Sequence, residues 1–167
     1  PYKKTLDVLS KVIQGLNIKL KYVDLGGGFG IKYNKIDKCV NLNDYAKLVH
    51  SFKKKLNCDI IFEPGRFLVG DTGILVSKIQ YIKKGLNKDF IIIDAGMNDF
   101  MRTALYDASH DIVPIIKTNK KNHGSIEFVG PICETTCKFV KYQKYQKIKE
   151  GDFVAITNVG AYGSSLS

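Results

Sequence analysis

The sequence predicts an α/β segment followed by an antiparallel β domain. Residues 1–66 alternate short apolar runs with helix-like stretches, which is the pattern of a parallel sheet or a (β/α) barrel. Beyond residue 66, long β-branched runs separated by polar turns indicate an antiparallel sheet. Glycine-bearing loops at residues 24–30 and 63–66 each follow a short apolar run. We therefore expect two domains, residues 1–66 and residues 67–167.

The elements of the first domain follow from apolar periodicity. Apolar residues recur at helical spacing over residues 5–16, and a strand is expected over residues 20–24. After the first glycine loop, a polar connection at residues 34–41 leads to a second helix, with Asn43 as its expected N-cap. A strand over residues 59–62 completes a βαβ unit.

The second domain is expected to be mostly strands. Residues 97–106 predict one short helix, and the Lys- and Asn-rich stretch at residues 117–124 predicts a polar turn. The expected strands are residues 67–84, 90–94, 126–129, 138–142 and 153–157.

Composition predicts a globular protein, and the two chain ends suggest a piece of a longer one. A hydrophobic content of 44% suits a globular protein, no stretch approaches the length of a membrane span, and no signal-peptide pattern begins the chain. We expect a cytoplasmic protein with no membrane partner. Because the chain begins without methionine and ends in a Ser-rich stretch, we expect it to be an internal piece of a longer protein.

The charge pattern argues against a nucleic-acid partner. The formal net charge is +10, but almost all of the excess is lysine scattered along helix faces and loops, as biased base composition would produce. The two arginines, Arg66 and Arg102, are therefore expected where a rigid bidentate fork is needed.

The four cysteines are expected to be free thiols. Without secretory features, disulfides are disfavoured for Cys39, Cys58, Cys133 and Cys137. Cys133 and Cys137 are separated by three residues and no second ligand pair follows at zinc spacing, so no metal site is expected.

The two glycine loops are candidate phosphate ligands. Gly26, Gly27 and Gly28 leave no side chain between the backbone amides and a ligand. In a (β/α) barrel, two such loops at the ends of neighbouring strands form a phosphate site. No nucleotide-binding fingerprint is present, and the alternative is two ordinary turns after strands.

The segment Glu63-Pro64-Gly65-Arg66 combines three functional groups. The Gly65 amide can bind phosphate, and Arg66 can hold a carboxylate in a fork. Glu63 beside a pyridine nitrogen would keep that nitrogen protonated, as an electron-sink cofactor requires. The alternative is a surface turn closed by a salt bridge.

A substrate-binding helix face is predicted at residues 94–106. Arg102 and Tyr106, four residues apart, share a helix face that suits a substrate bearing carboxylate and ammonium groups. The alternative is a solvated helix. His110 follows close by and is given no role.

Two further turns carry candidate groups. Cys133 can donate a proton to a carbanion and Glu134 can receive an ammonium, the alternative being a structural cysteine. Tyr162, between small residues after an apolar strand, can lie against a ring or bond a phosphate, the alternative being an ordinary loop aromatic.

Taken in order, these segments resemble the diaminopimelate decarboxylases, which are fold-type III pyridoxal-phosphate enzymes. The resemblance covers nearly the whole chain, and residues 94–110 are more similar to this family than to ornithine or arginine decarboxylases. It rests on Gly-Gly-Gly-Phe-Gly at 26–30, Glu-Pro-Gly-Arg at 63–66, residues 94–106, Gly-Pro-Ile-Cys-Glu at 130–134 and Gly-Ala-Tyr-Gly at 160–163.

The resemblance implies a fold, a reaction and an assembly. The expected fold is the last strands of a (β/α)8 TIM-like barrel followed by an antiparallel β-sandwich or Greek-key domain. The expected reaction uses pyridoxal 5'-phosphate to convert meso-2,6-diaminopimelate into L-lysine and CO2, the last step of lysine biosynthesis, in a homodimer with shared active sites.

The resemblance also implies residue roles. Cys133 would be the catalytic proton donor, reaching with Glu134 into the partner subunit's site. The implied cofactor ligands are Gly26, Gly27, Gly28, Glu63, Pro64, Gly65, Arg66 and Tyr162. The implied substrate ligands are Arg66, Arg102, Tyr106, Glu134 and Tyr162.

This chain departs from the family in several ways. The family's Schiff-base lysine and ring-stacking histidine lie in segments upstream of those matched here, so we expect the chain to be inactive alone. Thr103 and Thr135 replace a usual proline and serine, and His123-Gly124-Ser125 resembles the family's histidine segment in letters only. The alternatives are a carboxynorspermidine, ornithine or arginine decarboxylase, or a non-catalytic cofactor-binding or interaction module.

Overall fold

The protein divides into two compact units. The computed structural model describes residues 2–33, 37, 39–118 and 122–167. The first unit comprises Pro1–Ile31 and Lys38–Phe67, and the second comprises Lys32–Asp37 and Leu68–Ser167. The polar stretches expected at residues 34–41 and 117–124 lie partly outside the described residues.

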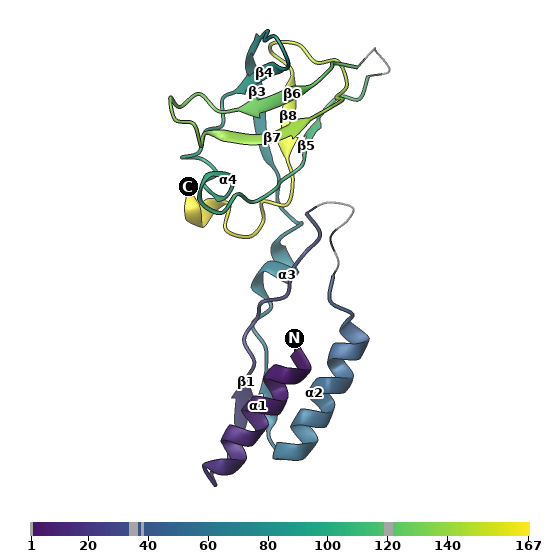
Figure 1. Cartoon of the computed structure of the whole chain (residues 1–167), viewed down its shortest axis with the longest axis vertical. Helices are drawn as coiled ribbons and strands as arrows, with labels where there is room; N and C mark the ends of the chain where they lie inside the picture. The colour runs from purple at the N-terminus through teal and green to yellow at the C-terminus, as the bar shows by residue number, and fades with distance from the viewer. Residues whose placement is uncertain (1, 34–36, 38, 119–121) are drawn as a thin grey trace. The chain divides into compact units, whose positions relative to one another are not determined.

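The first unit packs two helices against a small parallel sheet. Helices α1 (Tyr2–Gly15) and α2 (Leu42–Leu56) lie side by side (Figure 1). Strands β1 (Tyr22–Asp24) and β2 (Asp59–Ile61) pair in parallel, as the βαβ pattern predicted. Their shared core is buried because apolar side chains recur on one face of each helix. It comprises Leu6, Ile13, Val23, Val49, Phe52 and Cys58.

The N-cap of helix α2 lies two residues before the expected one. Asn41 is the N-cap, and its side-chain oxygen accepts hydrogen bonds from the amides of Asn43 and Asp44 at 3.0 and 3.2 Å. The prediction of Asn43 was wrong because both asparagines suit a cap, and only Asn41 is extended, with φ of −74°.

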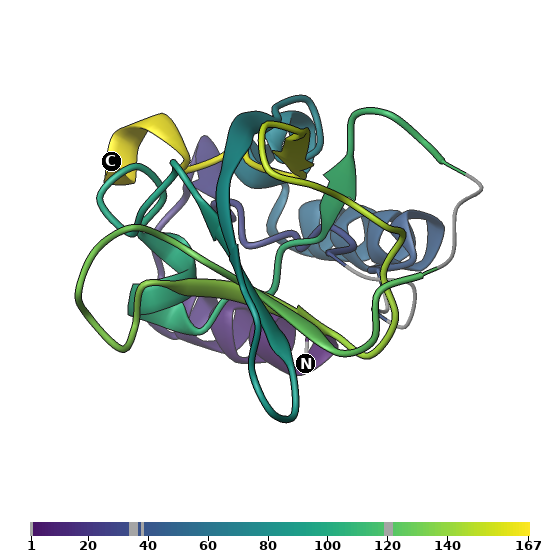
Figure 2. The ribbon, with the colours of Figure 1, turned by 90° about the horizontal axis from the view of Figure 1, so that it is seen from above.

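The second unit contains a six-stranded sheet with the order β5-β8-β3-β4-β6-β7. The strands are β3 (Leu75–Lys83), β4 (Asp89–Ile93), β5 (Ile112–Pro114), β6 (Ile126–Val129), β7 (Lys138–Tyr142) and β8 (Phe153–Ile156). The long strand β3 pairs with β8 along its first half and with β4 along its second half. The sheet curls along this strand (Figure 2).

The prediction of a wholly antiparallel sheet was wrong at one pair. Strands β4 and β6 are parallel, with Ile91 opposite Phe128, whereas all other pairs in this sheet's described residues are antiparallel. The chain between them forms helix α4 (Arg102–Tyr106) and strand β5, which adds to the opposite edge of the sheet. The chain thus crosses over and returns in the same direction, as a parallel pair requires.

Two predicted elements differ most from their observed bounds, whereas the other bounds differ by a few residues at most. Residues 67–74 were expected to be strand, but Gly65–Val69 forms helix α3 and β3 begins at Leu75. Gly70 and Gly73 place a turn between them, and an apolar run this short fits helix and strand equally. The helix expected from residue 97 begins at Arg102, because residues 96–101 form a turn.

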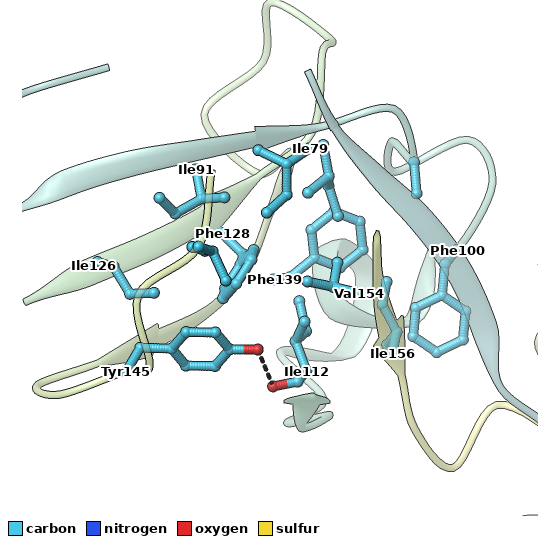
Figure 3. Close-up of a cluster of buried hydrophobic side chains, with 13 residues drawn as sticks. Ile79, Ile91, Phe100, Ile112, Ile126, Phe128, Phe139, Tyr145, Val154 and Ile156 are labelled. Atoms are coloured by element: carbon cyan, nitrogen blue, oxygen red, sulfur yellow. Dashed lines mark hydrogen bonds between the residues drawn. The ribbon is translucent and has the colours of Figure 1, made fainter. Parts of the chain in front are cut away.

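The core of the sheet also anchors the segment that leads to α4. Ile79, Ile91, Phe128 and Ile156 are fully buried, and Phe100 packs into the same cluster beside Ile156 (Figure 3). The hydroxyl of Tyr145 donates to the carbonyl of Ile112 at 3.0 Å, which fixes strand β5 at its edge. Phe100 therefore holds the chain in place two residues before Arg102.

Among the described helices, none has the length and apolar character needed to span a bilayer.

Candidate active site

The glycine loop after β1 is joined to the end of β2 by backbone hydrogen bonds. The amide of Leu25 donates to the carbonyl of Ile61 at 3.0 Å, and the amide of Glu63 donates to the carbonyl of Gly26 at 2.8 Å. The φ angles of Gly26 and Gly28 are +66° and +80°, a region that favours glycine. The two predicted glycine-bearing loops are thus neighbours in the first unit.

Gly27 is required by this close approach. A Cβ at Gly27 would lie 2.2 Å from the carbonyl oxygen of Glu63, so only glycine fits. Among the described residues, the amides of Gly27 and Gly28 donate no hydrogen bond. Two uncommitted amides on a loop without side chains suit a phosphate, so these residues fit the predicted cofactor group.

We expect Gly27→Ala to weaken binding of pyridoxal 5'-phosphate by about tenfold or more in the full-length protein, because the new methyl group forces the loop away from Glu63. Absorbance titration of the apoprotein with the cofactor measures this affinity. Gly30→Ala is the matched control, since a Cβ there meets open space. Equal affinities for the two variants would contradict the assignment.

The side chains of Glu63 and Arg66 lie in the same segment but are not paired with each other. Glu63 is exposed and Arg66 is half-buried at the start of α3. Within the described ranges, none of the salt bridges includes either residue. This disfavours the alternative of a turn closed by a salt bridge.

Arg102 is buried in the second unit among aromatic rings. Its exposed fraction is 7%, and its guanidinium carbon lies 5.8, 5.9 and 5.2 Å from the ring centroids of Tyr33, Tyr106 and Tyr162. Each distance lies within the range of cation–π attraction. We call Tyr33, Arg102, Tyr106, His110 and Tyr162 the Arg102 cluster.

The guanidinium of Arg102 is only partly engaged. Its Nε donates to Nε2 of His110 at 3.4 Å, and its Nη2 donates to the hydroxyl of Tyr33 at 3.3 Å. Among the described residues, Nη1 donates no hydrogen bond, and no carboxylate forms an ion pair with this arginine. A buried charge without an anionic partner is costly, so this one favours binding of an anion.

Tyr162 is held in the cluster by a strained turn. Its φ is +63°, and its side chain is 48% exposed beside Arg102. The neighbouring Gly160 packs directly on the turn at residues 69–73, donating its amide to the carbonyl of Gly70 at 3.1 Å. A Cβ at Gly160 would lie 1.8 Å from the carbonyl oxygen of Val69.

Cys133 and Glu134 lie on a separate, exposed loop between β6 and β7. The Glu134 carboxylate accepts a hydrogen bond from the Thr135 hydroxyl at 2.9 Å. This bond, followed by the amides of Thr136 and Thr135, lowers the pKa of Glu134. Glu134 is therefore ionised at neutral pH and can receive a cation.

The loop is anchored by the second cysteine. Cys137 is buried, and its sulfur accepts a hydrogen bond from the amide of Met97 at 3.4 Å. A Cβ at Gly130 would lie 2.4 Å from the same sulfur. Cys133 is exposed, so the two thiols differ in role: Cys137 is structural, whereas Cys133 is accessible.

The predicted site residues thus form three groups. Arg102, Tyr106 and Tyr162 come together in the second unit, and Gly27 meets Glu63 in the first. Within the part of the chain that the structure describes, no hydrogen bond or ion pair joins Cys133 or Glu134 to the Arg102 cluster. The described residues also contain no group of three or more His, Cys, Asp or Glu arranged to hold a metal ion.

Comparison with known protein families shows which family the chain belongs to. The model of the C-terminal sheet domain of pyridoxal-dependent decarboxylases matches residues 7–160. The chain belongs to this family. The family resemblance inferred from the sequence motifs is confirmed, and the decarboxylase family's name indicates a pyridoxal cofactor.

Members of the decarboxylase family named diaminopimelate decarboxylase are similar to the chain. The Aquifex aeolicus enzyme is 36% identical over all of this chain and 40% of its own length. The Haemophilus influenzae enzyme is 41% identical over 97% of this chain and 39% of its own length. The solved Helicobacter pylori enzyme, complexed with L-lysine, has 39% identity and a TM-score of 0.84 over 99% of this chain and 40% of that structure. The chain spans about two fifths of the length of these relatives.

Two members of the Arg102 cluster were missed or given no role by sequence reasoning. Tyr33 lies 69 residues before Arg102 and had no motif to mark it. His110 was noted only for its proximity to the predicted helix. The one local feature that could have indicated a role for His110 is its position four residues after Tyr106. The contact between His110 and Arg102 depends on the chain turning back after α4.

Proposed function

We propose that this chain forms the cofactor-phosphate loops and the sheet domain of a diaminopimelate decarboxylase. The reaction is decarboxylation of meso-2,6-diaminopimelate to L-lysine and CO2, in a homodimer in the cytoplasm. The first unit would supply the last strands of a (β/α)8 barrel, and the curled sheet would belong to a β-sandwich domain. Family membership, similar relatives and four free cysteines support this proposal.

One observation supports diaminopimelate as the substrate, rather than another amino acid decarboxylated by this family. Arg102 is a buried cation that no carboxylate among the described residues neutralises, and three tyrosine rings surround it. Such a group binds a carboxylate in a fork and penalises ligands that lack one. Diaminopimelate carries a second carboxylate and a second ammonium at the end remote from the reaction, whereas ornithine has only the ammonium.

Pyridoxal 5'-phosphate, when bound, supplies an electron sink for the charge left on the substrate carbon after loss of CO2. The uncommitted amides of Gly27 and Gly28 are the proposed phosphate ligands. The amide of Gly26 donates to the Asp24 carboxylate at 2.7 Å and that of Gly65 to the carbonyl of Glu63 at 2.8 Å, so Gly26, Pro64 and Gly65 are proposed to shape the cofactor loops. Glu63 is proposed to hold the proton on the ring nitrogen. Tyr162 is proposed to contact both cofactor and substrate.

The substrate's remote end is proposed to bind three kinds of group. Arg66 and Arg102 are the proposed ligands of its single carboxylate, Tyr106 adds a phenol beside Arg102, and Glu134 receives the ammonium. The exposed thiol of Cys133 would supply the proton that replaces the lost carboxyl group. Cys133 and Glu134 would act from the partner subunit. Their exposed loop fits this role, and among the described residues no hydrogen bond or ion pair joins them to the Arg102 cluster.

Substrate discrimination by the full-length protein tests the function. With pyridoxal 5'-phosphate, we expect equimolar CO2 and L-lysine from meso-diaminopimelate, and far slower CO2 release from ornithine, arginine or carboxynorspermidine. Preference for one of these three would assign the chain to another decarboxylase of this fold. Cofactor binding without CO2 release from any of them would favour a non-catalytic module.

The proton-donor role of Cys133 has its own test. We expect Cys133→Ala to lower turnover of meso-diaminopimelate by about 10²-fold or more in the full-length enzyme, because general acid catalysis contributes this much. Cys39→Ala is the matched control, since Cys39 is also exposed. Unchanged turnover of the Cys133 variant would remove the assigned role.

A further inference from the structure

His110 is a fully buried imidazole in contact with the proposed substrate-binding arginine. Its exposed fraction is 0%, and its ring lies edge-on to the rings of Phe100 and Tyr33, with centroids 4.7 and 4.9 Å away. Phe100 belongs to the sheet core. The position of the imidazole is therefore fixed from one side by the core and from another by the cluster.

The hydrogen bonds of His110 define its tautomer. Nδ1 lies 2.9 Å from the carbonyl oxygen of Thr157, which can only accept, so Nδ1 carries the hydrogen. Nε2 faces Nε of Arg102, which can only donate, so Nε2 presents its lone pair. The neutral ring with hydrogen on Nδ1 satisfies both partners, whereas a protonated ring would set two donors against each other.

The environment of the ring keeps it neutral. Burial lowers the pKa of His110, the Arg102 charge lowers it further, and the Thr157 hydrogen bond opposes both. Among the described residues, Arg102 and Tyr33 are the titratable groups that contact the ring. The pKa of His110 in the folded protein lies below its unfolded value of about 6.5. The neutral ring's hydrogen bonds to Thr157 and Arg102 therefore stabilise the folded state fully above that pH, and this stabilisation is lost as the pH falls through the folded-state pKa.

Because His110 is a neutral acceptor, it orients Arg102 without cancelling its charge. A carboxylate at the position of Nε2 would also orient the guanidinium, but it would neutralise the charge that a substrate must find. The imidazole holds Nε, and Tyr33 accepts from Nη2, while the positive charge remains available. Among the described residues, Nη1 keeps both of its N–H groups uncommitted.

We infer that His110 is the positioning residue of Arg102: it fixes the guanidinium without neutralising it, so that the remaining N–H groups meet the remote carboxylate of an amino-acid substrate. This inference rests on the proposed function. It assigns His110 a role in substrate affinity that acts through Arg102.

Three variants of the full-length enzyme separate orientation from charge. His110→Phe keeps the ring and loses the acceptor, so we expect KM for meso-diaminopimelate to rise about 10- to 100-fold with a smaller change in kcat. His110→Gln offers an amide oxygen to Arg102, and we expect recovery to within about threefold of wild type. His110→Glu supplies an acceptor that neutralises the guanidinium, so KM should stay high at neutral pH and fall toward acidic pH.

The control is His123→Phe. His123 is half-buried in the same unit, and its Nε2 donates to the carbonyl oxygen of Ile148 at 3.1 Å. Its replacement should leave KM unchanged. If His110→Phe does not fold, the contrast between the Gln and Glu variants decides the question.

The outcomes distinguish this inference from the proposed function. An inactive wild-type enzyme would overturn the proposed function. An active wild type with unchanged KM in the Phe variant, or equal loss in the Gln and Glu variants, would overturn the positioning role alone.

Discussion

Replacing Arg102 with methionine is expected to lower kcat/KM for meso-diaminopimelate roughly 10²–10³-fold in the full-length enzyme, because truncating one partner of a buried charge pair costs about 2–5 kcal/mol. The loss should appear mainly as a higher KM, since the remote carboxylate stays bound from ground state to transition state. Arg102 is 7% exposed, so its charge interacts with a bound carboxylate with little screening by water.

Steady-state kinetics of three variants check this expectation. Arg102→Lys keeps the charge but loses the planar fork and the contact of Nε with His110, so its kcat/KM should fall between those of wild type and Arg102→Met. Lys141→Met is the matched control, because Lys141 is an exposed cation in the same unit. A methionine variant with wild-type KM would exclude Arg102 from substrate binding.

Gly160→Ala is expected to destabilise the protein by about 2–4 kcal/mol, at the upper end of overpacking effects. The added methyl group would lie 1.8 Å from the carbonyl oxygen of Val69 and 2.9 Å from the amide nitrogen of Gly73. Both neighbours are backbone atoms, so no side-chain rotation can relieve the clash. Because the same turn carries Tyr162, activity should fall with stability.

Thermal unfolding of the full-length protein measures the first effect, and CO2 release measures the second. Gly124→Ala is the matched control, since a Cβ at Gly124 meets no atom within 4 Å. We expect its unfolding midpoint to match wild type. A Gly160→Ala midpoint equal to that of the Gly124 variant would show that the turn at residues 69–73 yields without cost.

Local patterns predicted much of the fold. Strands β6 and β7 have the predicted bounds, Ile126–Val129 and Lys138–Tyr142, because alternating apolar residues end at clear turn residues. The parallel pair β1 and β2 followed from the βαβ pattern. Arg102, Tyr106 and Tyr162 were predicted as site residues because arginine is rare in this lysine-rich chain and glycines flank the tyrosine. The structure brings the three side chains together, and their role in a site stays a prediction.

Long-range features could not be predicted in the same way. Strand β5 has three residues, which is too short to show an alternating apolar pattern in the sequence. It is held in the sheet by pairing with β8, about forty residues later. Tyr33 enters the Arg102 cluster only through the tertiary fold. The αL conformation of Tyr162 depends on the packing of Gly160 and Gly163, which no local propensity encodes.

The arrangement of the Arg102 cluster also bears on the order in which the protein folds. The bond between Arg102 and Tyr33 spans 69 residues, and that between His110 and Thr157 spans 47, so each requires closure of a long loop. Contacts of such high contact order form after local hairpins such as β3–β4, because the entropy of loop closure must be overcome first. We therefore expect a refolding chain to form the β3–β4 hairpin before it completes the Arg102 cluster, so that the proposed substrate site is assembled late in folding.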